Sequence, residues 1–187
     1  MLSIRCFWRS NPLSDKEEKL VAEVLKAHAQ SAFRANVSTQ IVRAATAASA
    51  SLTNGITAAI ATLGGPHAPI VATCEFLRLS DPVVYAKSMV AQKAKIPGWG
   101  NAFEKGHPDD LWNDAANALA AANPVLSKTI SDVTDALQAA GKNVYPNPSC
   151  FTAATALTVG MPIKLSPFLV LAGRLESWAM LTMDVLK

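Results

Sequence analysis

The sequence predicts an all-α protein, a helical core with a small helical subdomain. Half of the 187 residues are apolar, which is enough for a sizeable core, while aromatic residues make up only 6%. Alanine, serine and threonine are abundant, and small side chains suit close helix–helix contact. No segment alternates apolar and polar residues for more than a few positions, as a half-buried strand would. Helix-capping signals, by contrast, recur along the whole chain.

The first helix is predicted to begin after Ser14, because Ser14-Asp-Lys-Glu17 has the pattern of a capping box. The apolar residues behind it recur at helical spacing, at Leu20, Val21, Val24, Leu25 and His28. A long helical segment is then expected from Asn36 to Leu63. Gly64 and Gly65 follow it and allow the backbone to end a helix with positive φ.

Three proline-containing caps place the later helices. In each, a capping side chain comes directly before a proline that suits the first helical position, at Asp81-Pro82, Asn123-Pro124 and Ser166-Pro167. Gly141 and Gly160 are suited to end the preceding helices.

Composition excludes several classes of protein. The net charge of +3 comes without a basic stripe, so a nucleic-acid partner is not expected. The uncharged stretch from Ala44 to Leu63 is too poor in Leu, Ile and Phe for a membrane span, and we interpret it as a buried helix. Cys6, Cys74 and Cys150 form no Cys-x-x-Cys pair, which argues against a disulfide framework or a zinc site. With no signal-peptide pattern at the N-terminus, we expect a cytoplasmic protein without a metal.

Three short segments carry the clearest functional signal: Leu63-Gly-Gly-Pro-His-Ala-Pro69, Ile96-Pro-Gly-Trp-Gly-Asn101 and Lys142-Asn-Val-Tyr-Pro-Asn-Pro-Ser149. In order and spacing they resemble the active-site segments of the citrate synthase superfamily. That family typically shows Gly-Pro-Leu-His-Gly-Gly-Ala, then Pro-Gly-Phe-Gly-His, then Tyr-Pro-Asn-Val-Asp. The resemblance runs from about residue 36 to residue 184, and the citryl-CoA lyases are the family's other shorter branch.

The resemblance implies a citrate-synthase-like helical core and a division of the chain. Residues 1–35 would form an N-terminal helix or arm, residues 36–80 and 143–187 the large-domain core, and residues 81–142 a small helical subdomain. It also implies a homodimer, because the family's corresponding alanine-rich helix lies at a two-fold contact. A core helix within one monomer explains the same small residues equally well.

Two candidate catalytic residues follow from the first two segments. His67 falls on the family histidine that donates a hydrogen bond to the thioester carbonyl and so stabilises the enol. Asn101 stands where the family has a second histidine that polarises the electrophile. An amide still donates a hydrogen bond to a carbonyl oxygen, although it carries neither charge nor a titratable proton.

The third segment places Ser149 where the family has its catalytic base, an aspartate that removes the α-proton. A neutral hydroxyl is a poor base, so the base of this protein stays unassigned. Asn147 matches the family residue just ahead of it, and the resemblance makes it a candidate substrate-binding residue. The neighbouring Cys150 lies near a helix N-terminus, which lowers the pKa of an accessible thiol and suits a nucleophile, although most single cysteines are buried core residues.

Two further positions bear on a carboxylate substrate. Arg174 falls on the family arginine that binds a substrate carboxylate, and a cation in so apolar a helix needs an anionic partner. The family pattern Asp-Pro-Arg is His107-Pro108-Asp109 here, and Asp109 and Asp110 would repel the carboxylate that the family's second arginine grips. Two interpretations of this segment stay open. His107 forms a replacement acid–base pair with either aspartate, or the aspartates are ordinary residues that precede a helix at residues 111–122.

Coenzyme A is the expected co-substrate, with no permanently bound cofactor. Candidate contacts are Lys105 and Lys142 for its phosphates and Gly98 for close approach of its chain. The family's Gly-Gly after the first histidine is Ala68-Pro69 here, a departure that puts this approach in question.

Three functions follow from the resemblance and its departures. The first is an enzyme that makes or cleaves a C–C bond beside an acyl-CoA carbonyl through an enol or enolate, without efficient use of oxaloacetate. The second is a catalytically inactive homologue that binds a ligand or regulates a complete enzyme. The third is a thioester hydrolase or decarboxylase that uses Cys150 or His107.

Overall fold

A computed structural model describes residues 9–34, 37–61, 69–101 and 105–185, and it confirms the all-α prediction. Within these ranges the chain forms nine α-helices and two short 3₁₀-helices, with one isolated β-bridge between Trp99 and Pro146. The helices are α1 (Asp15–Ser31), α2 (Val37–Ser49), α3 (Leu52–Ile60), α4 (Ile70–Leu77), α5 (Pro82–Ala91), α6 (Asn113–Ala122), α7 (Pro124–Ala139), α8 (Pro148–Thr158) and α9 (Pro167–Val185). The 3₁₀-helices are η1 (Asp110–Trp112) and η2 (Ile163–Leu165).

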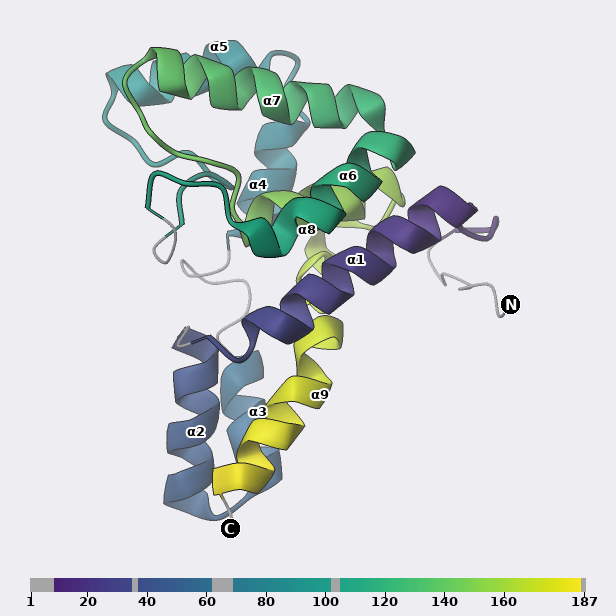
Figure 1. The fold of residues 1–187 in the computed structure, drawn as a ribbon, viewed down its shortest axis with the longest axis vertical. Coiled ribbons are helices and arrows are strands. Elements are labelled where there is room, and N and C mark those ends of the chain that lie inside the picture. Colours follow the sequence, from purple (N-terminus) through teal and green to yellow (C-terminus); the bar gives the residue numbers. More distant parts are fainter. Residues whose placement is uncertain (1–8, 35–36, 62–68, 102–104, 186–187) are drawn as a thin grey trace.

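The helices form two groups joined by α1 (Figure 1). Helices α4 to α8 make up the larger group, in which α4 packs on α8 and α5 packs on α7. Helices α2 and α3 pack on each other and on α9 in the smaller group. Helix α1 runs diagonally between the groups and packs against α6, α8 and α9.

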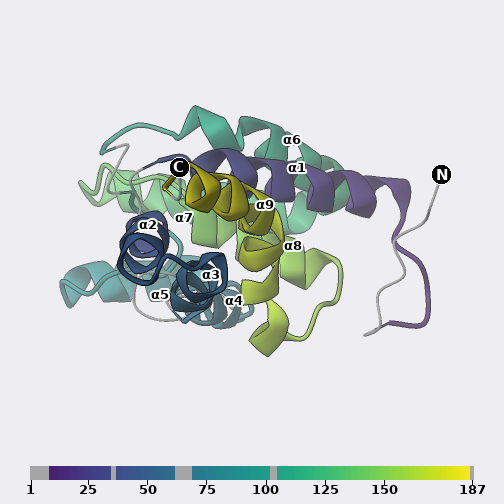
Figure 2. The same cartoon turned by 90° about the horizontal axis from the view of Figure 1, so that it is seen from below.

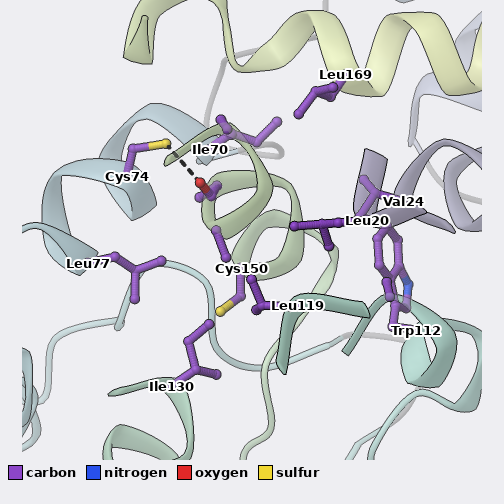
Figure 3. Close-up of a cluster of buried hydrophobic side chains, with 14 of the residues drawn as sticks. Leu20, Val24, Ile70, Cys74, Leu77, Trp112, Leu119, Ile130, Cys150 and Leu169 are labelled. Carbon is purple, nitrogen blue, oxygen red and sulfur yellow. Dashed lines mark hydrogen bonds between the residues drawn. The ribbon is translucent and has the colours of Figure 1, made fainter. Parts of the chain in front are cut away.

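The main hydrophobic core lies in the larger group, with α8 at its centre (Figure 3). It is built from aliphatic residues and small residues, so the helices approach closely. Helix α8 contributes Ala153, Ala154 and Ala156, all with no exposed surface. A smaller cluster, centred on the fully buried Trp178, holds α2, α3 and α9 together.

The segment expected to be one long helix from Asn36 to Leu63 is two antiparallel helices, so that prediction was wrong. Ala50 has a φ of 48°, and the Ser51 side chain then accepts a backbone hydrogen bond as the N-cap of α3. Figure 2 views α2 and α3 nearly end-on, side by side. Gly55 permits their contact, because a Cβ there would lie 3.1 Å from the Val42 carbonyl oxygen. A single strained residue and a serine cap therefore turn the chain back on itself.

Most of the other predicted helix signals are confirmed, whereas the Ser166 hydroxyl, expected to cap α9, donates to the Ile163 carbonyl over 2.7 Å. Ser14 and Glu17 form the capping box of α1, and the Asp81 and Asn123 side chains cap α5 and α7. Gly141 and Gly160 follow α7 and α8 with φ of 76° and 67°.

Helices α1 and α9 cross in close contact at Gly173. A Cβ at this position would lie 2.6 Å from the His28 Cβ and 2.7 Å from the Leu25 carbonyl oxygen. The glycine thus brings the next residue of α9, Arg174, close to α1. Among the described helices, none has the length and apolar character needed to cross a membrane.

Candidate functional site

The second and third sequence segments lie side by side in the structure. Trp99 and Pro146 form the antiparallel bridge. The Gly100 amide donates to the Tyr145 carbonyl, and the Asn147 amide donates to the Gly98 carbonyl, each over 2.9 Å. Segments about 45 residues apart in the sequence therefore form one rigid unit, which positions Asn101 at one end and the start of α8 at the other.

Asn147 joins this unit to α8. Its side-chain oxygen accepts hydrogen bonds from the Ser149 and Cys150 amides, at 2.9 and 3.3 Å, and so caps the helix. Its side-chain amide donates to the Gly100 carbonyl over 2.9 Å. Both ends of the side chain are thus engaged within the protein, and Asn147, expected to bind substrate, orients the two segments.

Gly98 is buried and has a packing reason to be glycine. Its φ is 88°, and a Cβ there would lie 2.6 Å from the Thr73 side chain and 3.3 Å from the Cys150 Cβ. The position expected to approach a cofactor instead faces the protein interior.

Arg174 is a half-buried cation held by two hydroxyl groups. Its Nη1 donates to Ser38 Oγ over 2.8 Å, and its Nη2 donates to Ser31 Oγ over 3.1 Å. Its Nε is buried without a hydrogen-bond partner in the described ranges, where no carboxylate pairs with it. Burial lowers the pKa of Arg174 to about 10, which leaves it charged at neutral pH. Such a half-buried cation is suited to bind an anion.

A small cavity of about 40 Å³ gathers the charged residues of the site. A single buried water needs about 10–15 Å³, so this space is the size of a few atoms. Its principal lining residues are Arg34, Asn101, Asp109, Trp112, Pro148 and Arg174. Of the nine predicted site residues, two, Asn101 and Arg174, line the cavity.

Asp109 is buried and receives four hydrogen bonds. Arg34 holds it with both terminal nitrogens, Nη1 to Oδ2 over 2.7 Å and Nη2 to Oδ1 over 3.1 Å. The Asn101 amide donates to Oδ2 over 3.1 Å, and the Leu111 backbone amide donates to Oδ1 over 3.2 Å. The hydrogen bond from the Leu111 amide matches one of the two expectations for Asp109, that of a residue placed just before a helix. The two-pronged pair with Arg34 is an additional role that the sequence did not reveal.

His28 packs against Trp112, which lines the cavity, and has 1% of its surface exposed. Its Nε2 lies 2.8 Å from Thr152 Oγ1, whose hydroxyl donates to the Pro148 carbonyl, so Nε2 carries the proton in this pair. Its ring stands edge-on to Trp112 at a centroid distance of 4.9 Å. Burial, and secondarily the charge of Arg174, hold the pKa of His28 well below its usual value. The imidazole is therefore neutral at physiological pH.

Ser149 and Cys150 lie in the first turn of α8. Ser149 is 9% exposed, and Cys150 has no exposed surface. Figure 3 shows Cys150 among the core residues, with Leu119 and Ile130 also drawn. Burial raises the pKa of the Cys150 thiol above its usual range, which outweighs its place near a helix N-terminus. Of the two interpretations of Cys150, the buried core residue is confirmed, and the activated nucleophile is not supported.

The other predicted residues do not meet in this cavity. His67 lies outside the described residues. His107, Lys105 and Lys142 are all exposed. In the described ranges, no group of His, Cys, Asp and Glu is arranged to hold a metal ion.

A larger cavity, of about 350 Å³, lies between α6, α7 and α8. It contains none of the predicted site residues. Phe151 on its wall stacks on Trp112 of the smaller cavity, with a centroid distance of 5.6 Å and an interplanar angle of 9°. We identify the smaller cavity as the candidate site, because it alone of the two brings the half-buried arginine, the buried ion pair and Asn101 together.

Fold and site together define an all-helical protein with a small cavity, lined by Arg174 and the Arg34–Asp109 ion pair, between α1, α9 and the loop before α6. The sequence profile described as "Citrate synthase, C-terminal domain" matches residues 4–183. The chain belongs to the citrate synthase family. A comparison with curated protein sequences gives no significant match.

Solved structures agree with this assignment at the level of the fold. A citryl-CoA lyase from Hydrogenobacter thermophilus is 19% identical with a TM-score of 0.77, over 95% of this chain and 72% of that chain. A citrate synthase from Thermoplasma acidophilum, in a ternary complex with carboxymethyl coenzyme A and oxaloacetate, is 19% identical with a TM-score of 0.72, over 94% and 50%. A citrate synthase from Thermotoga maritima is 20% identical with a TM-score of 0.73, over 95% and 50%. The chain thus spans half of each synthase chain.

Sequence reasoning missed three of the residues that shape the site. Arg34 gave no signal beyond its charge, because its partner Asp109 lies 75 residues away in the sequence. Ser31 and Ser38 gave no signal, because only the fold brings their hydroxyls to Arg174.

Proposed function

We propose that this protein is an acyl-CoA enzyme that makes or cleaves a C–C bond next to the thioester carbonyl through an enol or enolate. The observation that carries the proposal is the half-buried Arg174, which has no anionic partner in the described ranges and shares its cavity with Asn101. Arg174 would bind the carboxylate of the electrophile, and Asn101 would orient it. By resemblance, His67 would donate a hydrogen bond to the thioester oxygen as negative charge develops there.

The proposal also includes a co-substrate and an oligomeric state. Coenzyme A would be bound transiently, with the exposed Lys105 and Lys142 near its phosphates. The small subdomain would comprise residues 81–142, and the chain would act as a homodimer in the cytoplasm. The buried, unpaired thiols of Cys74 and Cys150 support a reducing compartment.

A second candidate function is a binding or regulatory homologue without catalysis. Two observations favour it. Ser149 stands at the position of the family's base, and Arg34 pairs with Asp109, the carboxylate in the cavity. Neither group is an effective proton acceptor in this state.

Exchange of α-protons separates these two functions. The purified protein is incubated with acetyl-CoA in deuterated water, and deuterium in the acetyl group is measured by mass spectrometry. An enzyme of the proposed type will catalyse exchange, and His67→Ala will abolish it. Arg174→Met will retain exchange, because Arg174 would contact the other substrate. Absence of exchange in the wild type, with or without a carboxylic acid present, would leave the binding function.

A further inference from the structure

The carboxylate of Asp109 occupies the candidate pocket as part of the protein itself. Its side chain is only 3% exposed, and the Arg34 side chain that pairs with it is 33% exposed. Because Arg34 engages both oxygens, the carboxylate is held in one orientation. The hydrogen bonds from Asn101 and Leu111 fix the carboxylate further in place.

The second guanidinium in the pocket is in a different situation. Arg174 is bound by neutral hydroxyls only, so its charge is not compensated by an acid in the described part of the chain. The pocket therefore presents one uncompensated positive charge at Arg174 and a fixed negative oxygen pair at Asp109. Trp112, which also lines the pocket, buries its indole Nε1 without a hydrogen-bond partner in the described ranges.

We propose that the Arg34–Asp109 ion pair restricts this pocket to small monocarboxylates and rejects dicarboxylates, an inference that rests on the proposed function for the role of the pocket. A ligand carboxylate binds at Arg174. The remainder of the ligand then faces the carboxylate of Asp109, where an uncharged oxygen is accepted and a second carboxylate is repelled. Juxtaposed like charges in a poorly solvated site are strongly unfavourable.

The size of the pocket supports the same class of ligand. A cavity of about 40 Å³ corresponds to roughly three water positions. This space suits the carboxylate of an acid together with its adjacent hydroxyl or keto oxygen. The proposed electrophile is thus a short 2-oxo monocarboxylic acid, and a 2-hydroxy acid is its non-reacting analogue for binding.

The test is calorimetric titration with matched acids, which needs no acyl-CoA and no turnover. Lactate and malate are the first pair, because malate carries the extra carboxylate. We expect the wild type to bind lactate at least about tenfold more tightly than malate, since like-charge contact opposes malate. Arg174→Met should abolish lactate binding. Equal or tighter binding of malate, or lactate binding that survives Arg174→Met, would overturn the proposal.

Asp109→Asn tests the ion pair directly. The change preserves the size of the side chain, removes its charge and leaves Arg34 available to an anion. The ratio of malate affinity to lactate affinity should rise about tenfold in this variant. An unchanged preference for lactate in a folded Asp109→Asn protein contradicts the proposed role of the charge.

A ligand comparison on the wild type gives the same answer if the variant does not fold. The 4-methyl monoester of malate keeps the length of malate but lacks the second charge. If charge decides, the ester binds within about threefold of lactate. If the ester is rejected together with malate, size decides and the inference is wrong. Failure of α-proton exchange leaves these binding results intact, so the two proposals fail separately.

Discussion

Individual side chains show how far the sequence predicted the site. Asn101 and Arg174 were expected to act on one ligand, and the structure brings them to one cavity. The partner of Asp109 was not predictable, because Arg34 lies 75 residues away and pairs with it only through the fold. Asn147 and Gly98 were expected to touch ligands, whereas their contacts are a helix cap and a close packing contact. Motif positions thus predicted only two residues that line the cavity, and two others have structural contacts in place of ligand contacts.

The buried neutral His28 makes the stability of the protein depend on pH. Its pKa in the folded protein is depressed by burial, while in the unfolded chain it is about 6.5. The neutral histidine is therefore compatible with the fold above pH 6.5, and stability is lost as the pH falls below that value. Each pH unit of this range costs about 1.4 kcal/mol. Urea unfolding measured at pH 7.5, 6.5 and 5.5 will show the decline.

His28→Gln provides the matched variant for this prediction, since glutamine removes the titration and retains a donor for Thr152. Its stability should fall less between pH 7.5 and 5.5 than that of the wild type. The exposed His107→Gln serves as the control and should follow the wild-type profile. Identical profiles for all three proteins would rule out His28 as the source.

At the scale of the helices, the sequence predicted the helix caps, because a cap depends on residues that are close together in the sequence. Ser14, Asp81 and Asn123 cap their helices as expected, because a capping side chain bonds to amides two or three residues away. The break at Ala50 was not predictable, since alanine favours a continuous helix. Packing of α2 on α3 stabilises the turn, and packing is a property of residues distant in the sequence.

The crossing of α1 and α9 depends on Gly173. Gly173→Ala should destabilise the protein by about 1–3 kcal/mol, because the new methyl group overlaps the His28 Cβ and the Leu25 carbonyl. The gain in helix propensity, about 1 kcal/mol, offsets only part of this cost. Urea denaturation measures the change. Glu176→Ala on the exposed side of α9 is the control, with an effect within about 0.5 kcal/mol.

A stability of Gly173→Ala equal to or above that of the wild type would show that α1 and α9 separate easily. In that case Arg174 would not be fixed relative to Ser31 on α1. The position of the half-buried cation therefore depends directly on this helix crossing.

The whole molecule presents a surface suited to the proposed homodimer. Along α2, the exposed side chains of Ala44, Ala47 and Ala48 are small and uncharged, so a second copy can approach closely. We expect size-exclusion chromatography with light scattering to give twice the 19.7 kDa mass of the chain. Ala48→Glu should shift the protein to the monomer, because it places a charge in the contact.

Val125→Glu is the matched control, since Val125 is 76% exposed on α7, in the other helix group. It should leave the oligomeric state unchanged. A monomeric wild type, or a dimer that tolerates Ala48→Glu, would contradict a contact through α2.

The stacking of Trp112 on Phe151 gives the protein a natural optical probe. The indole lines the small cavity, and its emission depends on the polarity and the charges around it. Its edge-on neighbour His28 quenches indole emission once protonated, so acidification will be visible at the same wavelength. Occupancy of the pocket and the ionisation of His28 can thus be followed in the unlabelled protein, by intrinsic fluorescence in a single cuvette.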